Sequence, residues 1–390
     1  MNTEMIRAGI PILEKNLFLN SAGASIPSVE VNKVILSYLE EELELGGYAL
    51  QFKSEDLFKA FYSEIARLIN CSPENIAFAS SATDAYGKAL SSIPFEKDDV
   101  ILTSDDDYVS NFFQFINLRD RYGLRVLRMP LLDNGDLNLS AIQELIKKEK
   151  PKLVALAHIP TNSGLIQDVE AVGNMCKEEN SIYLVDACQS VGQIVVDVQK
   201  LQCDFLSVTG RKFMRGPRGT GFLYVSDRML EAGYRSITMD GGGALWTEAM
   251  TYQLESSAKR FELWEKPYGL FLGFTEAVRY INHIGIAKIE DYNQVIASRL
   301  RENLNNIKGV NLLDRGSRHS NILTFRKEDV SQEKCQNHFQ KNGLICGIGS
   351  RNHAVIDYDK KGITWLVRLS PHYFNTIDEM DRVAQIIEDL

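Results

Sequence analysis

The sequence predicts an α/β fold, with a large domain built on a mostly parallel central sheet flanked by helices and a small α+β domain at the C-terminus. The chain has 390 residues, 44% of them hydrophobic, which is enough for a large core and a second, smaller one. From about residue 55 to about residue 225, short apolar runs alternate with amphipathic stretches. That alternation is typical of βαβ units, whose parallel strands are buried on both faces.

Six apolar runs are the strand candidates of the large domain, and the stretches between them include two with helical spacing. The predicted strands cover residues 75–80, 99–104, 152–159, 181–188, 204–210 and 220–225. The predicted helices include residues 139–150 and 168–180. In such a sheet, ligands bind at the carboxyl ends of the strands and at the helix N-termini that follow. We therefore expect the functional residues there.

The pattern of apolar runs and helical stretches divides the chain into three segments. We expect an N-terminal segment at 1–30, the large domain at 31–285 and the small domain at 286–390. After about 225, residues 240–246 ("DGGGALW") predict a loop, and 257–281 predict a loop that enters a long helix. The small domain is expected to hold helices at 286–307 and 376–390 and strands at 320–326, 344–349 and 365–370.

Composition argues against several classes of partner and location. The net charge of −9 argues against nucleic-acid or anionic-membrane surfaces, so neither partner is expected. No apolar run approaches the roughly 18 residues of a membrane helix, and the first residues lack the order of a signal peptide, so the cytoplasm is expected. The six cysteines form no C-x-x-C pair and the six histidines are isolated, which predicts reduced thiols and no metal site.

Asp186 stands at the end of the apolar run "IYLVD". A carboxylate at the inner end of a buried strand is costly unless it meets a cation. One reading is an ordinary buried salt bridge, or an N-cap for a helix that begins near Gln189. The other is a partner for the protonated ring nitrogen of pyridoxal phosphate (PLP), which makes the ring an electron sink.

Lys212 follows the next apolar run, in "TGRKFMRGPRGTG". A short βα connection is expected to return it to the same crevice, beside Thr209 and Arg211. A desolvated lysine among cations has a lowered pKa, so its amine can form a Schiff base. Taken alone, Lys212 is as readily a surface lysine.

A third element is "SSATDAYGKAL" at 80–90, a strand-to-helix junction. Small residues there leave backbone N–H groups free, so Ala82 and Thr83 are expected to bind a phosphate. A plain capping motif is the alternative.

Three elements follow one another along the chain: the expected phosphate loop at 80–90, the Asp-x-x-Gln motif of Asp186 and Gln189, and Lys212. This is the order found in a known family. The chain resembles the class V aminotransferase group of fold-type I PLP enzymes, which includes cysteine desulfurases, selenocysteine lyases, isopenicillin-epimerase-like proteins and ergothioneine-pathway C–S lyases. The resemblance runs from "LFLNSAGASIP" at 17–27 to "VRLSPHYFNTIDEMDRV" at 367–383. The pair "D-A-x-Q" and "T-G-R-K…G-P-R-G-T-G" is its specific part.

The resemblance implies roles for the cofactor-binding residues. Asp186 pairs with the pyridine nitrogen, Gln189 with the ring hydroxyl, and Lys212 is the Schiff-base lysine and proton shuttle. The phosphate is held by Thr209, Arg211, Ala82 and Thr83.

Tyr108 occupies the place where desulfurases have a histidine that stacks on the ring. It can stack, but it cannot donate a proton near pH 7 without a shifted pKa. A half-buried loop aromatic is the alternative.

The resemblance also implies a substrate side and a second subunit. Arg368 matches the arginine that grips the substrate α-carboxylate. Either Thr161 or Asn162 is expected to contact the substrate, and Asn20 and Ala22 belong to a segment that lines this side. The glycine-rich loop at 240–246 is expected to reach a partner subunit, so a homodimer with a shared active site is predicted.

The chain departs from the desulfurases in its cysteines. They carry a persulfide-forming cysteine about 15 residues before the carboxylate arginine, where this chain has His353. Cys346 falls in a predicted strand, and we expect it in the core. The sequence therefore predicts a PLP enzyme that is not a persulfide-type cysteine desulfurase.

The predicted reaction is β-elimination by a C–S lyase on a cysteine-derived amino acid. A class V aminotransferase is the alternative, and an amino-acid epimerase a further one. A nucleotide-binding dehydrogenase is disfavoured because no G-x-G-x-x-G follows the first strand. A protein that binds PLP without catalysing a reaction is a further alternative, and it requires that Lys212 takes no part in chemistry.

Overall fold

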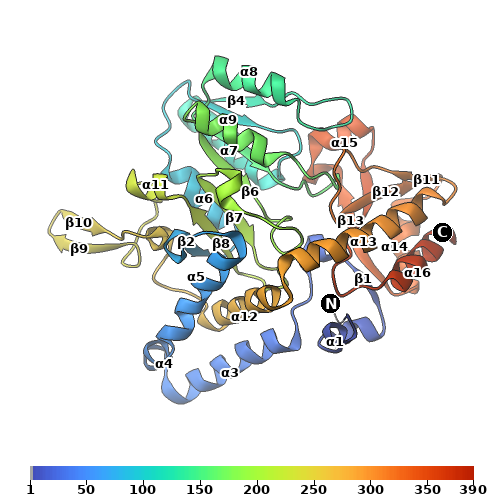
Figure 1. Cartoon of the computed structure of the whole chain (residues 1–390), viewed down its shortest axis with the longest axis horizontal. Helices are drawn as coiled ribbons and strands as arrows, with labels where there is room; N and C mark the ends of the chain where they lie inside the picture. Colours follow the sequence, from blue (N-terminus) through green and yellow to red (C-terminus); the bar gives the residue numbers. More distant parts are fainter. Residues whose placement is uncertain (1–2) are drawn as a thin grey trace.

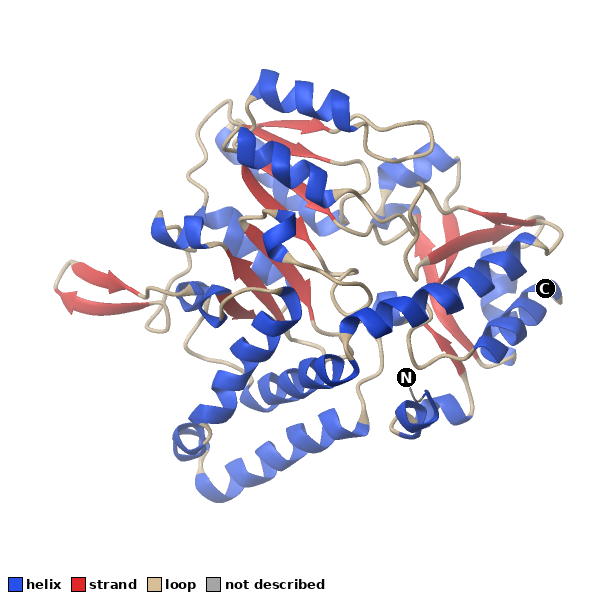
Figure 2. Cartoon of the chain, viewed as in Figure 1, coloured by secondary structure: helices blue, strands red, loops and turns tan. Residues whose placement is uncertain are grey.

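The computed structural model describes residues 3–390, which form two large sheets with helices packed around them and one two-stranded hairpin (Figures 1 and 2). The larger sheet has seven strands in the order β2-β8-β7-β6-β5-β3-β4. Neighbours pair in parallel from β4 to β7, whereas β8 is antiparallel to β7 and to β2. Its strands are β2 (Ile76–Ala79), β3 (Val100–Thr103), β4 (Arg125–Arg128), β5 (Leu153–Ala157), β6 (Ile182–Asp186), β7 (Phe205–Thr209) and β8 (Gly221–Val225). The predicted α/β class with a mostly parallel central sheet is confirmed.

Both faces of the larger sheet are buried, which explains why its strands are continuous apolar runs. In β6, Ile182 and Leu184 pack into the core on one face, while Tyr183 and Val185 pack into the core on the other. The surrounding helices are α5 (Glu55–Ile69), α6 (Ala82–Ser92), α7 (Val109–Tyr122), α8 (Leu139–Glu149), α9 (Val169–Glu178), α10 (Val198–Leu201), α11 (Asp227–Glu231) and α12 (Tyr268–Ile284).

Two features of this sheet differ from the sequence prediction. The edge strand β4 was not predicted, because its outer residues Arg125 and Arg128 are exposed and its run is short. After β7 the chain does not enter a helix; it turns through 210–220 and returns as β8, antiparallel to β7, with Thr209 opposite Gly221. The expected βα connection after β7 is therefore wrong, although Lys212 still lies at the carboxyl end of the sheet.

The smaller sheet has the order β1-β13-β14-β12-β11 and packs with the C-terminal helices (Figure 1). The N-terminal β1 pairs in parallel with β13, with Leu17 opposite Leu344. Strands β1 and β11 add to the three predicted ones. The elements are β1 (Leu17–Leu19), β11 (Val310–Leu312), β12 (Leu323–Lys327), β13 (Leu344–Ser350), β14 (Trp365–Leu369), α13 (Ile286–Asn305), α14 (Gln332–Lys341), α15 (Val355–Lys361) and α16 (Ile377–Glu388).

The N-terminal helices and one hairpin complete the chain. The helices are α1 (Thr3–Ala8), α2 (Ser21–Ala24), α3 (Val29–Leu45) and α4 (Gly47–Lys53). Where only a loop was predicted, β9 (Ala244–Glu248) and β10 (Thr251–Leu254) form a hairpin that projects from the body (Figure 1). Within residues 3–390, no helix is both long and apolar enough to span a membrane.

Candidate active site

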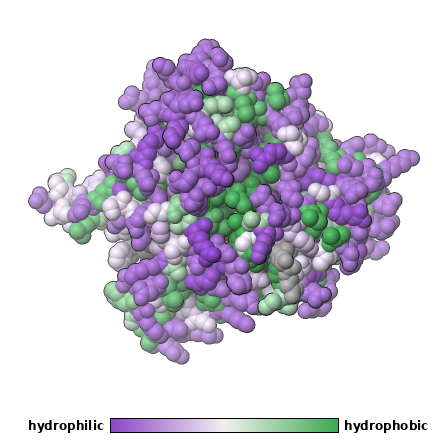
Figure 3. Space-filling model, in the orientation of Figure 1, coloured by the Kyte–Doolittle hydropathy of each residue, from purple (hydrophilic) through white to green (hydrophobic). Residues whose placement is uncertain are grey.

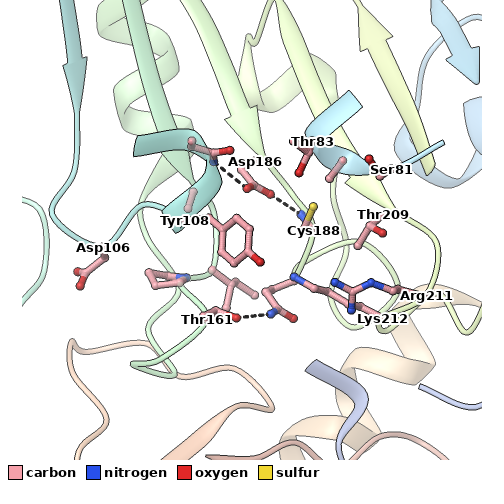
Figure 4. Close-up of a pocket in the computed structure, with 16 residues that line it drawn as sticks. Ser81, Thr83, Asp106, Tyr108, Thr161, Asp186, Cys188, Thr209, Arg211 and Lys212 are labelled. Atoms are coloured by element: carbon pink, nitrogen blue, oxygen red, sulfur yellow. Dashed lines mark hydrogen bonds between the residues drawn. The ribbon is translucent and has the colours of Figure 1, made fainter. Parts of the chain in front are cut away.

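A cavity opens at the carboxyl ends of β5, β6 and β7, beside the N-terminus of α6 (Figure 4). It brings together nine of the residues predicted from sequence. They are Ala82, Thr83, Tyr108, Thr161, Asp186, Gln189, Thr209, Arg211 and Lys212. The other four predicted residues, Asn20, Ala22, Asn162 and Arg368, are not among the residues that line this cavity; their contacts place them next to it, as described below.

Asp186 is buried and is held by hydrogen bonds rather than by a cation. Its Oδ2 accepts from the Asn111 side chain at 3.0 Å and its Oδ1 from the Cys188 backbone N–H at 3.0 Å. No ion pair of Asp186 exists within residues 3–390, and a turn rather than a helix follows at Gln189. Both structural alternatives, the salt bridge and the N-cap, therefore fail, and the carboxylate can still accept from a ligand N–H.

Asn111 is a site residue that the sequence analysis missed. From the first turn of α7 its amide nitrogen donates to Asp186 and to Oδ1 of Asp107, at 3.0 and 2.8 Å. Asp107 also accepts from Thr103 at 2.8 Å, and burial together with nearby Asp186 raises the pKa of Asp107 to about 6. The signal was the i, i+4 spacing of Asp107 and Asn111, which places both on one side of a helix start.

Lys212 is buried, with 7% of its surface exposed, so it is not a surface lysine. Burial lowers the pKa of its amine; Cys188 and Asp186 oppose that shift, and the cations Arg211 and Arg368 add to it. Its Nζ lies 5.6 Å from the centre of the Tyr108 ring. A lysine with a lowered pKa spends more time as the neutral amine, which is the nucleophilic form.

The glycines around Lys212 permit its tight approach to the sheet. A β-carbon at Gly221 would overlap the Val208 carbonyl oxygen and stand 3.4 Å from the Ser81 carbonyl carbon. The Gly210 N–H donates to the Thr220 carbonyl at 2.8 Å, which closes the 210–220 turn. Glycine at 221 therefore brings the end of β7 against the start of α6.

The start of α6 is both a capped helix and one wall of the cavity. Ser81 caps it by accepting from the Asp84 N–H at 3.1 Å, so the capping alternative is realised. Ala82 and Thr83 nevertheless line the cavity, opposite Arg211 (Figure 4). A helix N-terminus and a permanent cation on the same cavity suit a phosphate group.

Arg368 is joined to the cofactor cavity through Thr161. Arg368 Nη1 donates to the Thr161 hydroxyl at 3.0 Å and to its carbonyl at 3.3 Å. The same hydroxyl accepts from Gln189 Nε2 at 2.6 Å, and this amide also donates to the Ala22 carbonyl at 3.2 Å. Thr161, rather than Asn162, is thus the residue that links the two sides.

Asn20 and Asn162 lie on the Arg368 side. A β-carbon placed at Gly347 would be 3.2 Å from Arg368 Nε and 3.4 Å from Asn20 Oδ1. A β-carbon at Gly349 would be 3.4 Å from Asn162 Oδ1. Arg211 extends to the same region, where its guanidinium donates to the Gly23 carbonyl.

The donor set fits PLP. Within residues 3–390, Asp186 has no ion-pair partner and can accept from a ring N–H, and the buried Gln189 Oε1 has no hydrogen-bond partner. Lys212 supplies an amine of lowered pKa, and Tyr108 presents its ring to the same cavity. One cavity thus holds an amine that can react with the PLP aldehyde, an aromatic side chain that can stack on its ring and a carboxylate that can accept from its ring nitrogen.

Comparison with known proteins places the chain in one family. The family model Aminotransferase class-V matches residues 17–383. The "Probable cysteine desulfurase" of Methanothermobacter thermautotrophicus is 27% identical over 100% of this chain and 98% of that protein. The apo cysteine desulfurase from Thermococcus onnurineus NA1 has a TM-score of 0.91 at 24% identity, covering 99% of this chain and 97% of that one. C-DES with glycine covalently linked to its PLP cofactor has a TM-score of 0.86 at 20% identity, covering 98% and 99%.

These relatives overturn the predicted reaction. The exclusion of a persulfide-type cysteine desulfurase, and with it the C–S lyase prediction, conflicts with relatives at up to 27% identity that are named cysteine desulfurases. The exclusion depended on a fixed count back from Arg368 to His353, which lies in a short 3-10 helix before α15. Loop lengths vary among relatives more than sheets do, so a residue absent at one loop position does not define the reaction.

The cofactor and class predictions stand on firmer ground. The match of the class V aminotransferase family model to residues 17–383 implies PLP as the cofactor. The chain belongs to the class V aminotransferase family and is a PLP-dependent enzyme.

Proposed function

We propose that this enzyme removes the sulfur of cysteine, as a cysteine desulfurase does. The observation that carries the proposal is the full-length match to relatives with that name, at 27% identity over 100% and 99% of this chain. The site agrees with an amino-acid substrate, because Lys212 and Thr161 line one cavity and Arg368 donates to the Thr161 hydroxyl from beside it.

Each side of the site has a distinct task in this proposal. Arg368 binds the α-carboxylate through its guanidinium and so orients the amino acid. Lys212, with its lowered pKa, accepts and returns protons at the substrate α-carbon. Bound PLP supplies the electron sink for that chemistry.

The cofactor contacts are part of the proposal. Asp186 would accept from the ring N–H and Gln189 would contact the ring hydroxyl, while Tyr108 stacks on the ring. The phosphate would be held by Ala82, Thr83, Thr209 and Arg211. The support is that all of these side chains line one cavity.

A homodimer belongs to the proposal as well. The β9–β10 hairpin carries exposed apolar side chains, with Leu245 66%, Trp246 77% and Met250 93% exposed. Figure 3 shows both hydrophobic and hydrophilic surface on this projection. Exposed apolar groups on a projecting hairpin are a typical subunit contact. Light scattering of the purified protein tests this, and an active monomer would contradict it.

The deciding experiment follows the products of L-cysteine. With dithiothreitol as reductant, desulfuration converts cysteine to alanine and hydrogen sulfide while dithiothreitol is oxidised. Elimination would instead give pyruvate, ammonia and hydrogen sulfide without a reductant. We expect alanine in a one-to-one ratio with sulfide; pyruvate in its place would refute the proposal.

A further inference from the structure

Tyr358, on α15, places its phenol on the face of β13 that is turned toward the active site. Residues of a strand alternate between faces. Cys346 and Ile348 pack on the core of the smaller sheet. Gly347 and Gly349 lie on the other face, where a β-carbon at Gly349 would overlap the Tyr358 hydroxyl.

The two glycines leave room on one face of β13 for two side chains. Gly347 faces Arg368, and Gly349 faces Tyr358 with Asn162 close by. A β-carbon at Gly349 would overlap the Tyr358 hydroxyl, and one at Gly347 would lie in tight contact with Arg368 Nε at 3.2 Å. The sequence "CGIG" thus makes room on this face of β13 for the Tyr358 phenol and the Arg368 guanidinium.

Tyr358 and Arg368 both hold a hydrogen-bond donor that the chain does not use. Tyr358 is 0% exposed, and its hydroxyl has no hydrogen-bond partner within residues 3–390. Arg368 Nε is buried and unpartnered in the same described part of the chain. A guanidinium has no acceptor atom, so the phenol cannot donate to it. Two buried donors without an acceptor are unfavourable until a ligand supplies one.

The phenol stays protonated and is therefore available as a donor. Burial and the neighbouring Asp357 raise the pKa of Tyr358, and Arg368 only partly offsets this shift. An anion beside Arg368 is the acceptor that would satisfy both groups.

The helix that carries Tyr358 makes three ion pairs, in each of which the carboxylate is buried. Asp357 lies 3.2 Å from Arg315 and 2.8 Å from Lys361. Lys360 lies 2.6 Å from Asp105, which precedes Tyr108 by three residues. The Lys360–Asp105 pair thus ties α15 to the loop between β3 and α7, which lines the cofactor cavity.

We propose that Tyr358 is a substrate-binding residue whose O–H donates to the α-carboxylate that Arg368 holds. The assignment rests on the proposed role of Arg368 in desulfuration and adds a residue that selects amino acids over simple amines. Arg368 supplies the charge, and Tyr358 supplies a directional hydrogen bond to the same group.

The test is a binding titration of the PLP-loaded protein that needs no turnover. L-Alanine and ethylamine, which is L-alanine without its carboxylate, are titrated while the cofactor absorbance is recorded, with calorimetry as a second readout. Tyr358→Phe is compared with wild type. Tyr38→Phe is the matched control. Tyr38 also has a buried hydroxyl with no hydrogen-bond partner in the described part of the chain, but it packs against Phe58 and Tyr268 in another part of the molecule.

We expect Tyr358→Phe to raise the dissociation constant of L-alanine at least about tenfold and to leave that of ethylamine unchanged. Tyr38→Phe should change neither. An unchanged L-alanine constant, or an equal loss for both ligands, would overturn the assignment. If wild type binds L-alanine but releases no alanine from cysteine, the proposed reaction fails while this assignment is judged by the titration alone.

Discussion

The two sides of the active site satisfy their polar groups differently. On the cofactor side, built by the larger sheet, Asp186 accepts two hydrogen bonds from the chain itself. On the substrate side, next to the smaller sheet, Asn20 Oδ1, Tyr358 OH and Arg368 Nε are buried without hydrogen-bond partners among the described residues 3–390. The Asp186 carboxylate is thus pre-organised by the chain, whereas the three atoms on the substrate side, like Gln189 Oε1 on the cofactor side, are left for a ligand.

This difference predicts how variants on each side should behave. A substitution on the cofactor side should lower the rate of the chemical step. A substitution on the substrate side should weaken binding of the amino acid and leave the cofactor in place. The predictions below test that division, from the largest expected effect to the smallest.

Lys212→Ala should abolish turnover, because no other lysine within residues 3–390 lines the cofactor cavity. The phosphate contacts remain, so the variant should still bind PLP without a covalent link. The measurement is intact mass after borohydride reduction, together with alanine release. A reduced adduct on a different lysine in wild type would contradict the assignment.

Arg368→Ala should lower kcat/KM for cysteine by a factor that corresponds to a loss of about 2–5 kcal/mol in binding free energy, because the substrate carboxylate would lose its charged partner. The cofactor absorbance of the resting protein should be unchanged, since Arg368 does not line the cofactor cavity. Steady-state kinetics and the resting spectrum are measured together. Loss of PLP from this variant would break the division between the two sides.

The cofactor side was predictable from sequence because its residues are contiguous at strand ends. "DACQ" and "TGRK" each place two or three contacting side chains within four residues, so local pattern is enough. Asn111 was missed because its contact with Asp186 spans 75 positions and depends on how α7 meets β6.

The substrate side was less predictable because it forms between elements far apart in the chain. Arg368 was found only through the family pattern, and Tyr358 carries no local signal: its role depends on Gly349 across the sheet. The count from Arg368 back to His353, in the segment before α15, led to a wrong functional prediction because loop lengths vary among relatives. The hairpin β9–β10 was taken for a loop, since its exposed strands lack an apolar face.

Thr161→Val should produce an intermediate effect, because this hydroxyl connects the two sides. It accepts from Gln189 at 2.6 Å and from Arg368 at 3.0 Å, so valine leaves two donors unpaired at nearly equal volume. We expect KM for cysteine to rise on the order of tenfold with a smaller change in kcat. Thr161→Ser keeps the hydroxyl and should restore wild-type kinetics; equal loss in both variants would refute the bridging role.

Asp106→Asn should change how the stability of the fold depends on pH rather than catalysis. Asp106 lies in the loop between β3 and α7, and both of its carboxylate oxygens are buried without hydrogen bonds within residues 3–390. Its nearest cation is Arg315 at 3.6 Å. Burial raises the pKa of Asp106 to about 6, with Asp357 and Asp105 adding to the rise and Arg315 and Lys361 opposing it.

Because the folded-state pKa of Asp106 lies above its usual value of 3.8, its protonated form favours the fold. That contribution is complete below about pH 4 and is lost as pH rises through about 6. Wild type should therefore lose on the order of 1–3 kcal/mol of unfolding free energy relative to Asp106→Asn between pH 5 and pH 8. Urea unfolding of both proteins across that range measures the difference. If the difference in unfolding free energy between the two proteins does not vary with pH, Asp106 is ionised throughout this range. The ion pair with Arg315, rather than burial, would then determine its charge.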